Sequence, residues 1–172
     1  MSNSSPSTTE HRQTAEKSVG VAVLTVSDTR TIETDRGGAL LCELVAQHGH
    51  RVLERDLTPD DPERMRTTIA RFQANAEVEA ILITGGTGIA PRDNTYETVA
   101  ALLTKPLPGY GELFRMLSWH EVGPAAMLSR AIAGVVGRTV LFTMPGSTNA
   151  VRTACEKLIL PELAHVVHEA TK

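Results

Sequence analysis

The chain is poor in cysteine. Its only cysteines are Cys42 and Cys155, each within an apolar helical pattern, and its six histidines are scattered along the sequence. Two such cysteines suit buried, reduced thiols better than a disulfide framework, and no Cys/His spacing resembles a zinc site. These absences argue against a disulfide-stabilised secreted protein and against a zinc protein, and we expect a cytoplasmic location.

Long apolar runs and an excess of one charge are also missing. No stretch approaches the roughly 20 apolar residues that cross a bilayer, and the N-terminus has no apolar signal-peptide core. The chain has 17 basic and 20 acidic residues, so its formal net charge is −3, and no extended basic run occurs. A protein that binds nucleic acid would carry a basic footprint. We therefore expect no membrane and no nucleic-acid partner.

What the chain does contain is an alternation of strand and helix patterns. Residues 1–17 are polar and are expected to form a disordered tail, which leaves residues 18–172 as a single domain. Near-continuous apolar runs, such as residues 19–26, are typical of strands covered on both faces. The alternation predicts an α/β fold with a three-layer, doubly wound, mostly parallel sheet and helices on both faces.

The remaining segments refine this expectation. Asp35 can cap a helix that ends at Gly49. A short edge strand is predicted at residues 51–55, and helical pieces at residues 112–119 and 124–129. Residues 131–135 and 139–144, separated by a Gly-Arg turn, predict a small β-hairpin that extends the sheet. The closing helices should be broken or bent at Pro161.

Residues 80–95 form the most informative stretch. An apolar run is followed by glycines at 85, 86 and 88 and then by Arg92 and Asp93, which indicates strand, open loop and helix start. No Walker lysine follows the glycines, and Pro91 stands where a dinucleotide fingerprint needs glycine. The glycines allow successive N–H groups to form a concave donor surface for an anion, although a tight connection needs small residues too.

Helix capping accounts for some acidic residues here and leaves others unexplained. Asp61, followed by Pro62, is a complete N-cap signal, so the neighbouring Asp60 has no local role. Asp93 can cap the helix that begins near Thr95. Asn94, with Glu97 three residues later, can form a capping box instead, and Asp93 would then face the loop.

Four polar loops follow predicted strands and should meet at the carboxyl-terminal edge of the sheet. They lie around Ser27 and Asp28, at Asp60, at residues 85–93 and at residues 145–147. Carboxylate oxygens suit Mg²⁺, which takes one or two protein carboxylates and completes its shell with water and phosphate. No Cys/His pair or Ser/His/Asp arrangement is evident, so phosphoryl or nucleotidyl transfer fits better than acyl transfer.

Several separated motifs carry a family resemblance. Residues 84–88, the Arg92-Asp93 pair, and residues 108–115, 127–130 and 144–147 together resemble the molybdopterin-binding family of molybdenum cofactor biosynthesis, of the MogA/MoaB type. The likeness runs from about residue 19 to the C-terminus. The fold is shared with a domain of the molybdenum insertase, so the fold alone does not fix the reaction.

The resemblance implies Mg²⁺-dependent transfer of AMP from ATP to the terminal phosphate of molybdopterin, giving adenylylated molybdopterin and pyrophosphate. It implies Asp93 and Asp60 as catalytic carboxylates and Mg²⁺ ligands, with Ser27 and Asp28 helping to hold substrate or metal. It also implies a homotrimer, or a hexamer of two trimers, and the molybdenum insertase as a partner. The remaining residues that it assigns to substrate binding are Gly85, Gly86, Thr87 and Gly88 at phosphate, Glu112, Ser129 and Ser147 on the pterin side, and also Pro145 and Gly146.

Structural alternatives exist for three of these residues. Glu112 can compensate a helix dipole, Ser129 can be a helix-end hydroxyl, and Ser147 can be an N-cap. The alternative function is a non-catalytic carrier or scaffold that holds molybdopterin without turnover. Asp60 and Asp93 favour the enzyme, because they would repel a phosphate ligand unless a cation lay between them.

Overall fold

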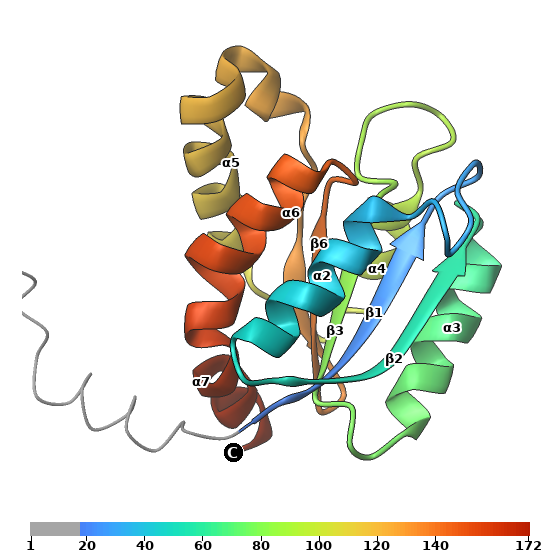
Figure 1. Ribbon diagram of the computed structural model, residues 1–172, viewed down its shortest axis with the longest axis vertical. Coiled ribbons are helices and arrows are strands. Elements are labelled where there is room, and N and C mark those ends of the chain that lie inside the picture. Colours follow the sequence, from blue (N-terminus) through green and yellow to red (C-terminus); the bar gives the residue numbers. More distant parts are fainter. Residues whose placement is uncertain (1–17) are drawn as a thin grey trace, which may run out of the picture.

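Six strands form one mixed sheet with the order β2-β1-β3-β6-β5-β4 (Figure 1). The computed structural model describes residues 18–172, so the predicted tail at residues 1–17 lies outside the described residues. β2, β1, β3 and β6 run parallel, whereas β5 and β4 are each antiparallel to their neighbours. The predicted hairpin is the β5–β6 pair, and it extends the sheet as expected. The strands are β1 (Gly20–Val26), β2 (Arg51–Thr58), β3 (Ala80–Thr84), β4 (Lys105–Pro106), β5 (Ala133–Val136) and β6 (Thr139–Met144).

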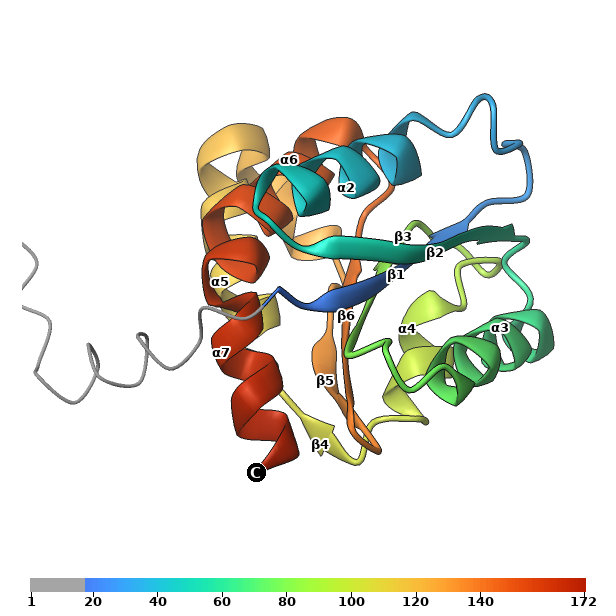
Figure 2. The same cartoon turned by 60° about the horizontal axis from the view of Figure 1, so that its bottom comes forward.

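Helices cover both faces of this sheet, as Figure 2 shows, and the predicted three-layer fold is confirmed. One face carries α2 (Arg36–Gln47), α5 (Pro108–Val122), α6 (Thr148–Ala154) and α7 (Leu160–Thr171). The other face carries α3 (Pro62–Ala74) and α4 (Thr95–Ala100).

Strand β1 shows how the sequence produces two cores. All seven of its residues are buried. Val21 and Val23 pack into the core under α2 and α5, whereas Ala22 and Leu24 pack into the core under α3 and α4. Side chains alternate between the faces of a sheet. A strand with a helix layer on each side therefore has to be apolar at every position.

Two predicted helix caps are confirmed. The Asp35 side chain accepts a hydrogen bond from the backbone N–H of Gly38 at the start of α2. Asp61 accepts from the N–H of Arg64, with proline at the first turn of α3. Because Asp61 is the cap, the side chain of Asp60 is free for another role.

The predicted capping box at Asn94 is wrong. Asn94 occupies the N-cap position of α4, but its side chain makes no capping hydrogen bond. Its amide group instead donates to the carbonyl of Arg92 at 2.9 Å. The carboxylate of Glu97 pairs with Arg130 and is not turned back to the helix start. The backbone N–H of Asn94, which a capping box would pair with Glu97, donates to Oδ1 of Asp60 instead. Long-range partners, Asp60 and Arg130, have therefore taken both groups of the local motif.

Several element boundaries also differ from prediction. β2 extends through Thr58 rather than ending at Arg55, and it is an edge strand. α5 begins at Pro108, which suits the first helical position. The segment η1 (Gly123–Leu128) is a 3₁₀ helix, and η2 (Cys155–Ile159) is a π-helical turn just before Pro161, where a bend was predicted. Between residues 18 and 172, no helix has both the length and the apolar character needed to cross a membrane.

Candidate functional site

The loops after β1, β2 and β3 meet at one edge of the sheet. The three strands are adjacent and parallel, so their carboxyl ends lie together. The loops enclose a hollow of about 140 Å³, which we call the carboxylate hollow. Its lining residues are Val26, Ser27, Asp28, Thr29, Asp60, Gly86, Arg92 and Asp93.

Backbone donors hold the three carboxylates of the hollow. The N–H of Asp60 donates to Oδ1 of Asp28 at 2.9 Å, and the N–H of Asn94 donates to Oδ1 of Asp60 at 2.9 Å. The N–H of Ala90 donates to Oδ2 of Asp93 at 3.0 Å. Each bond engages one oxygen of a carboxylate and leaves the other available to a ligand. The three side chains are thus oriented by loops other than their own or by a tight local turn.

The carboxylates also influence one another electrostatically. Burial raises the pKa of Asp60 above its ordinary value, and the negative charges of Asp93 and Asp28 raise it further, while the N–H of Asn94 opposes the shift. Carboxylates that repel one another gain most from a shared cation. The hollow is therefore poised for a positively charged ligand.

The glycines of the loop make room for these carboxylates. A Cβ atom placed on Gly86 would lie 2.4 Å from Oδ2 of Asp60, and one placed on Gly88 would lie 2.6 Å from Oδ2 of Asp93. Gly86 also has a φ of +62°, which side-chain-bearing residues rarely adopt. Gly85 lines neither this hollow nor the cavity beside it, and its N–H donates to the carbonyl of Met144.

The donor set of the hollow fits Mg²⁺ held together with a substrate. Among residues 18–172, no three or more Asp, Glu, His or Cys side chains form a ready-made metal cage. Mg²⁺ does not require one, because it commonly uses one or two carboxylates and takes its other ligands from phosphate and water. Asp60 and Asp93 supply hard oxygen donors at the position where a phosphate can approach the glycine loop.

A second cavity, of about 340 Å³, adjoins the hollow and shares Gly86 with it; we call it the adjoining cavity. It lies between the glycine loop, α5, η1 and the loop after β6. Ser147 lines it and also caps α6, since its Oγ accepts from the N–H of Ala150 at 3.2 Å. Both interpretations of Ser147 are compatible. The lining residues are Gly86, Thr87, Gly88, Phe114, Ser118, Glu121, Val122, Ala125, Ala126, Leu128, Ser129, Pro145, Gly146, Ser147, Asn149 and Ala150.

Glu112 lies apart from this group. It lines a different cavity, of about 630 Å³, together with Tyr96, Arg115 and Arg130. Ser129 borders both cavities. The structure therefore brings Ser129 and Ser147 together beside the glycine loop, but it does not place Glu112 with them.

Arg130 was given no role in the prediction from sequence, but it supports the glycine loop through hydrogen bonds. Its guanidinium donates to the carbonyl of Gly88 at 2.8 Å and to the carbonyl of Asp93 at 2.9 Å. It also pairs with Glu97 and lies 5.2 Å from the centre of the Tyr96 ring. Its position directly after Ser129, in one of the recognised motifs, was the only signal in the sequence.

Arg30 provides a similar link between the first and last loops. Its Nη1 donates to the carbonyl of Gly146 at 3.3 Å and lies 3.9 Å from the buried carboxylate of Asp35. The loop after β6 is thereby tied to the start of α2. Arg30 thus links the loop after β1 to the loop after β6, and Arg130 links the segment after η1 to the glycine loop. Neither arginine lines the carboxylate hollow or the adjoining cavity.

The chain is similar to known proteins over most of its length. The model of a family described as "Probable molybdopterin binding domain" matches residues 22–165. The chain belongs to this family. The matched region contains the carboxylate hollow, the glycine loop and the adjoining cavity. The family recognised from the sequence motifs is therefore confirmed.

Other members of the family agree with this assignment. The molybdenum cofactor biosynthesis protein B of Bacillus cereus is 50% identical over 164 residues, which cover 95% of this chain and 97% of that protein. A crystal structure of a molybdenum cofactor biosynthesis protein B superposes with a TM-score of 0.87 at 50% identity, covering 90% and 96% of the two chains. The tungsten cofactor synthesizing protein MoaB from Pyrococcus furiosus gives a TM-score of 0.79 at 36% identity, covering 91% and 99%.

Proposed function

We propose that this chain transfers AMP from ATP to the terminal phosphate of molybdopterin, in a Mg²⁺-dependent reaction that releases pyrophosphate. One observation carries the proposal. The carboxylate hollow and the mostly apolar adjoining cavity lie on either side of one glycine loop and share Gly86. A ligand with a phosphate at one end and a ring at the other matches that arrangement.

The glycine loop supplies donors for the phosphates. The N–H groups of Gly86, Thr87 and Gly88 have no hydrogen-bond acceptor within residues 18–172. Their spacing along the loop allows them to bind phosphate oxygens. Arg92 lines the carboxylate hollow, and its guanidinium would be a further cationic donor. Phosphate is thus bound between backbone donors on one side and the carboxylates on the other.

Asp60 and Asp93 would hold Mg²⁺, and Asp28 would support Asp60 through the Asp60 N–H bond. When bound, Mg²⁺ neutralises the phosphate charge that the carboxylates would otherwise repel. In the transfer, an oxygen of the molybdopterin phosphate forms a bond to the α-phosphorus of ATP. The bond from that phosphorus to the bridging oxygen breaks, and its electron pair leaves with pyrophosphate.

This reaction asks little covalent chemistry of the protein. The attacking phosphate is already ionised at neutral pH, so no general base is needed. Positioning of two anionic substrates, with charge neutralisation, can supply most of the acceleration. Rigid support of the loops by Arg30 and Arg130 serves that positioning.

Product formation tests the proposal. The purified chain is incubated with MgATP and molybdopterin, and adenylylated molybdopterin and pyrophosphate are measured by mass spectrometry and a coupled assay. Both products should appear, chelation of Mg²⁺ should stop the reaction, and Asp93→Asn should abolish turnover while the protein remains folded. Molybdopterin binding without product would contradict the transferase and favour the non-catalytic carrier.

We also propose that copies of the chain associate, as a trimer or a hexamer of two trimers. The outer surface of α5 and η1 exposes large apolar side chains, and soluble monomers rarely expose such a patch. The exposed apolar residues of this surface are Leu113, Met116, Trp119, Val122, Met127 and Leu128.

We place the reaction in the cytoplasm, where the free thiols Cys42 and Cys155 stay reduced. We expect the molybdenum insertase to receive the product.

A further inference from the structure

Among residues 18–172, one charged side chain, that of Glu121, lines the adjoining cavity. The other lining residues of that range are apolar, such as Phe114 and Val122, or uncharged and polar. The Glu121 side chain is 25% exposed. A carboxylate that lines a mostly apolar cavity is costly unless it has hydrogen-bond donors. Its presence therefore bears on which ligand the cavity accepts.

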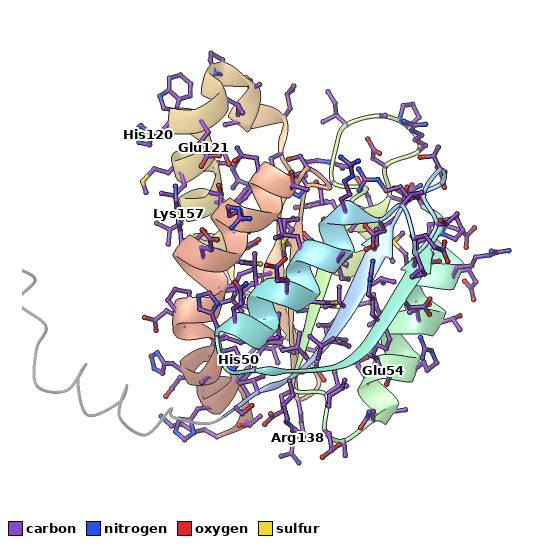
Figure 3. The ribbon with its side chains drawn as sticks, in the orientation of Figure 1. His50, Glu54, His120, Glu121, Arg138 and Lys157 are labelled. Atoms are coloured by element: carbon purple, nitrogen blue, oxygen red, sulfur yellow. The ribbon has the colours of Figure 1, made fainter. Side chains whose placement is uncertain are left out.

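Glu121 is held in place from α6 and η2. It accepts hydrogen bonds from Asn149 at 2.6 Å, from Thr153 at 2.7 Å and from Lys157 at 3.4 Å. Figure 3 shows Glu121 on α5 and Lys157 below it. The Thr153 hydroxyl, then the Lys157 ammonium and the Asn149 amide, lower the pKa of Glu121, so it is ionised at neutral pH. The carboxylate is thus an ionised acceptor oriented by three protein donors.

This contact also fixes the orientation of Asn149. An ionised carboxylate only accepts, so the Asn149 group that contacts Oε2 of Glu121 is the NH₂ of its amide. Asn149 also lines the cavity, and its amide oxygen is then left as an acceptor. A carboxylate offers about four acceptor positions, and three are used by these protein donors. The wall thus presents acceptors from both Glu121 and Asn149.

We propose that Glu121, with Asn149, is the specificity-determining pair of the adjoining cavity and binds the donor edge of an aminopyrimidinone ring. This inference rests on the proposed function, in which that cavity receives the pterin. The aminopyrimidinone edge of a pterin carries a ring N–H next to an exocyclic NH₂, which are two adjacent donors. The hydrogen-bonding edge of adenine pairs its NH₂ with a ring nitrogen acceptor, which faces repulsion from an all-acceptor wall. The pair thereby selects the pterin over the nucleotide base.

Two simple ring compounds test the proposal with the full chain. Pterin carries the exocyclic NH₂, whereas lumazine has a carbonyl oxygen at that position and otherwise the same bicyclic ring. Affinities are measured by fluorescence titration and calorimetry. The wild-type chain should bind pterin at least about tenfold more tightly than lumazine, because a charge-assisted hydrogen bond is replaced by repulsion. In Glu121→Gln the preference should fall to about twofold or less.

Two further variants separate recognition from structural support. Glu156→Gln removes an exposed carboxylate that pairs with Arg152 on a nearby turn, and should keep the wild-type preference. Lys157→Met removes the ion-pair partner of Glu121 but leaves the carboxylate, and should also keep the preference even if thermal stability falls. If Glu121 had only a structural role, Lys157→Met and Glu121→Gln would show the same preference for pterin over lumazine.

The inference is overturned if the wild-type chain fails to prefer pterin, including by binding neither ring, or if Glu121→Gln retains the full preference. These outcomes are independent of turnover. A pterin preference that depends on Glu121, in a chain that forms no adenylylated product, would support the recognition pair and contradict the transferase. Product formation, with no effect of Glu121→Gln on the preference for pterin, would support the transferase and contradict the recognition pair.

Discussion

The backbone N–H of Asp60 donates to Oδ1 of Asp28 at 2.9 Å, which joins the loop after β2 to the loop after β1. The next bond continues the relationship, since Asn94 donates its N–H to Oδ1 of Asp60 at 2.9 Å. The three loops therefore support one another through the same groups that form the carboxylate hollow. A substitution of one carboxylate should therefore alter the positions of the neighbouring carboxylates.

Asp60→Asn should stabilise the protein at neutral pH while it reduces activity. The pKa of Asp60 is raised above 3.8 by burial and by the charges of Asp93 and Asp28. The folded state therefore binds the proton more tightly than the unfolded chain, so stability is lost as pH rises through the folded-state pKa. A neutral amide avoids that loss and can still accept from Asn94.

Thermal unfolding from pH 4 to pH 8 checks this prediction. The variant should have the higher Tm at pH 8, and the difference should shrink as pH falls toward the ordinary Asp pKa of 3.8. Excess Mg²⁺ with ATP should stabilise the wild-type chain more than the variant. A variant that is less stable than the wild type at pH 8 would show that the carboxylates do not repel one another.

Gly88→Ala should reduce turnover by roughly a hundredfold with little loss of fold, because displacement of a catalytic group by about 1 Å has an effect of that size. The new Cβ would lie 2.6 Å from Oδ2 of Asp93 and would push that carboxylate out of place. Gly109→Ala is the matched control, since a Cβ there meets nothing within 4 Å. Steady-state rates of product formation compare the two, and equal rates would contradict the placement of Asp93.

Arg130→Met should destabilise the protein by about 1–3 kcal/mol, the usual range for losing hydrogen bonds from a charged donor. The side chain is replaced by an apolar group that leaves the carbonyls of Gly88 and Asp93 without their donor. Arg152→Met removes an exposed pair with Glu156 and should change stability by about 0.5 kcal/mol or less. Denaturant unfolding measures both, and similar losses would refute a special role for Arg130.

Met116→Lys should weaken self-association. Met116 is 53% exposed on the apolar surface of α5, and a charge at an apolar interface costs free energy of association. Ala70→Lys, on the exposed side of α3, adds the same charge elsewhere. Sedimentation velocity should show oligomers for the wild type and Ala70→Lys and smaller species for Met116→Lys. A monomeric wild type would contradict the proposed assembly.

The sequence predicted the elements whose signals are local. Apolar runs identified the buried strands. Asp35 and Asp61 indicated where their helices begin, because an N-cap hydrogen bond involves only residues of the first helical turn. The meeting of Asp28, Asp60 and Asp93 followed from topology, since adjacent parallel strands end at one edge. Each of these predictions used periodicity or a rule of sheet connection, and neither requires knowledge of distant side chains.

Predictions failed where distant partners decide the outcome. Asn94 and Glu97 fit a capping box, yet the N–H of Asn94 donates to Asp60 and the carboxylate of Glu97 pairs with Arg130. Nothing near Arg130 in the chain indicates that it reaches Gly88, which is 42 residues away. The resemblance assigned Glu112 and Ser129 to one side of the ligand; both line the cavity of about 630 Å³, whereas only Ser129 also lines the adjoining cavity.

The most direct test of the account is whether Asp60 and Asp93 hold one divalent cation together with nucleotide. Mn²⁺ can replace Mg²⁺ at oxygen-ligand sites and is visible by electron paramagnetic resonance. With an ATP analogue that cannot be cleaved at the α-phosphate, the wild-type chain should immobilise one Mn²⁺ per site, and the folded double variant Asp60→Asn, Asp93→Asn should not. Equal Mn²⁺ binding by both proteins would contradict the account.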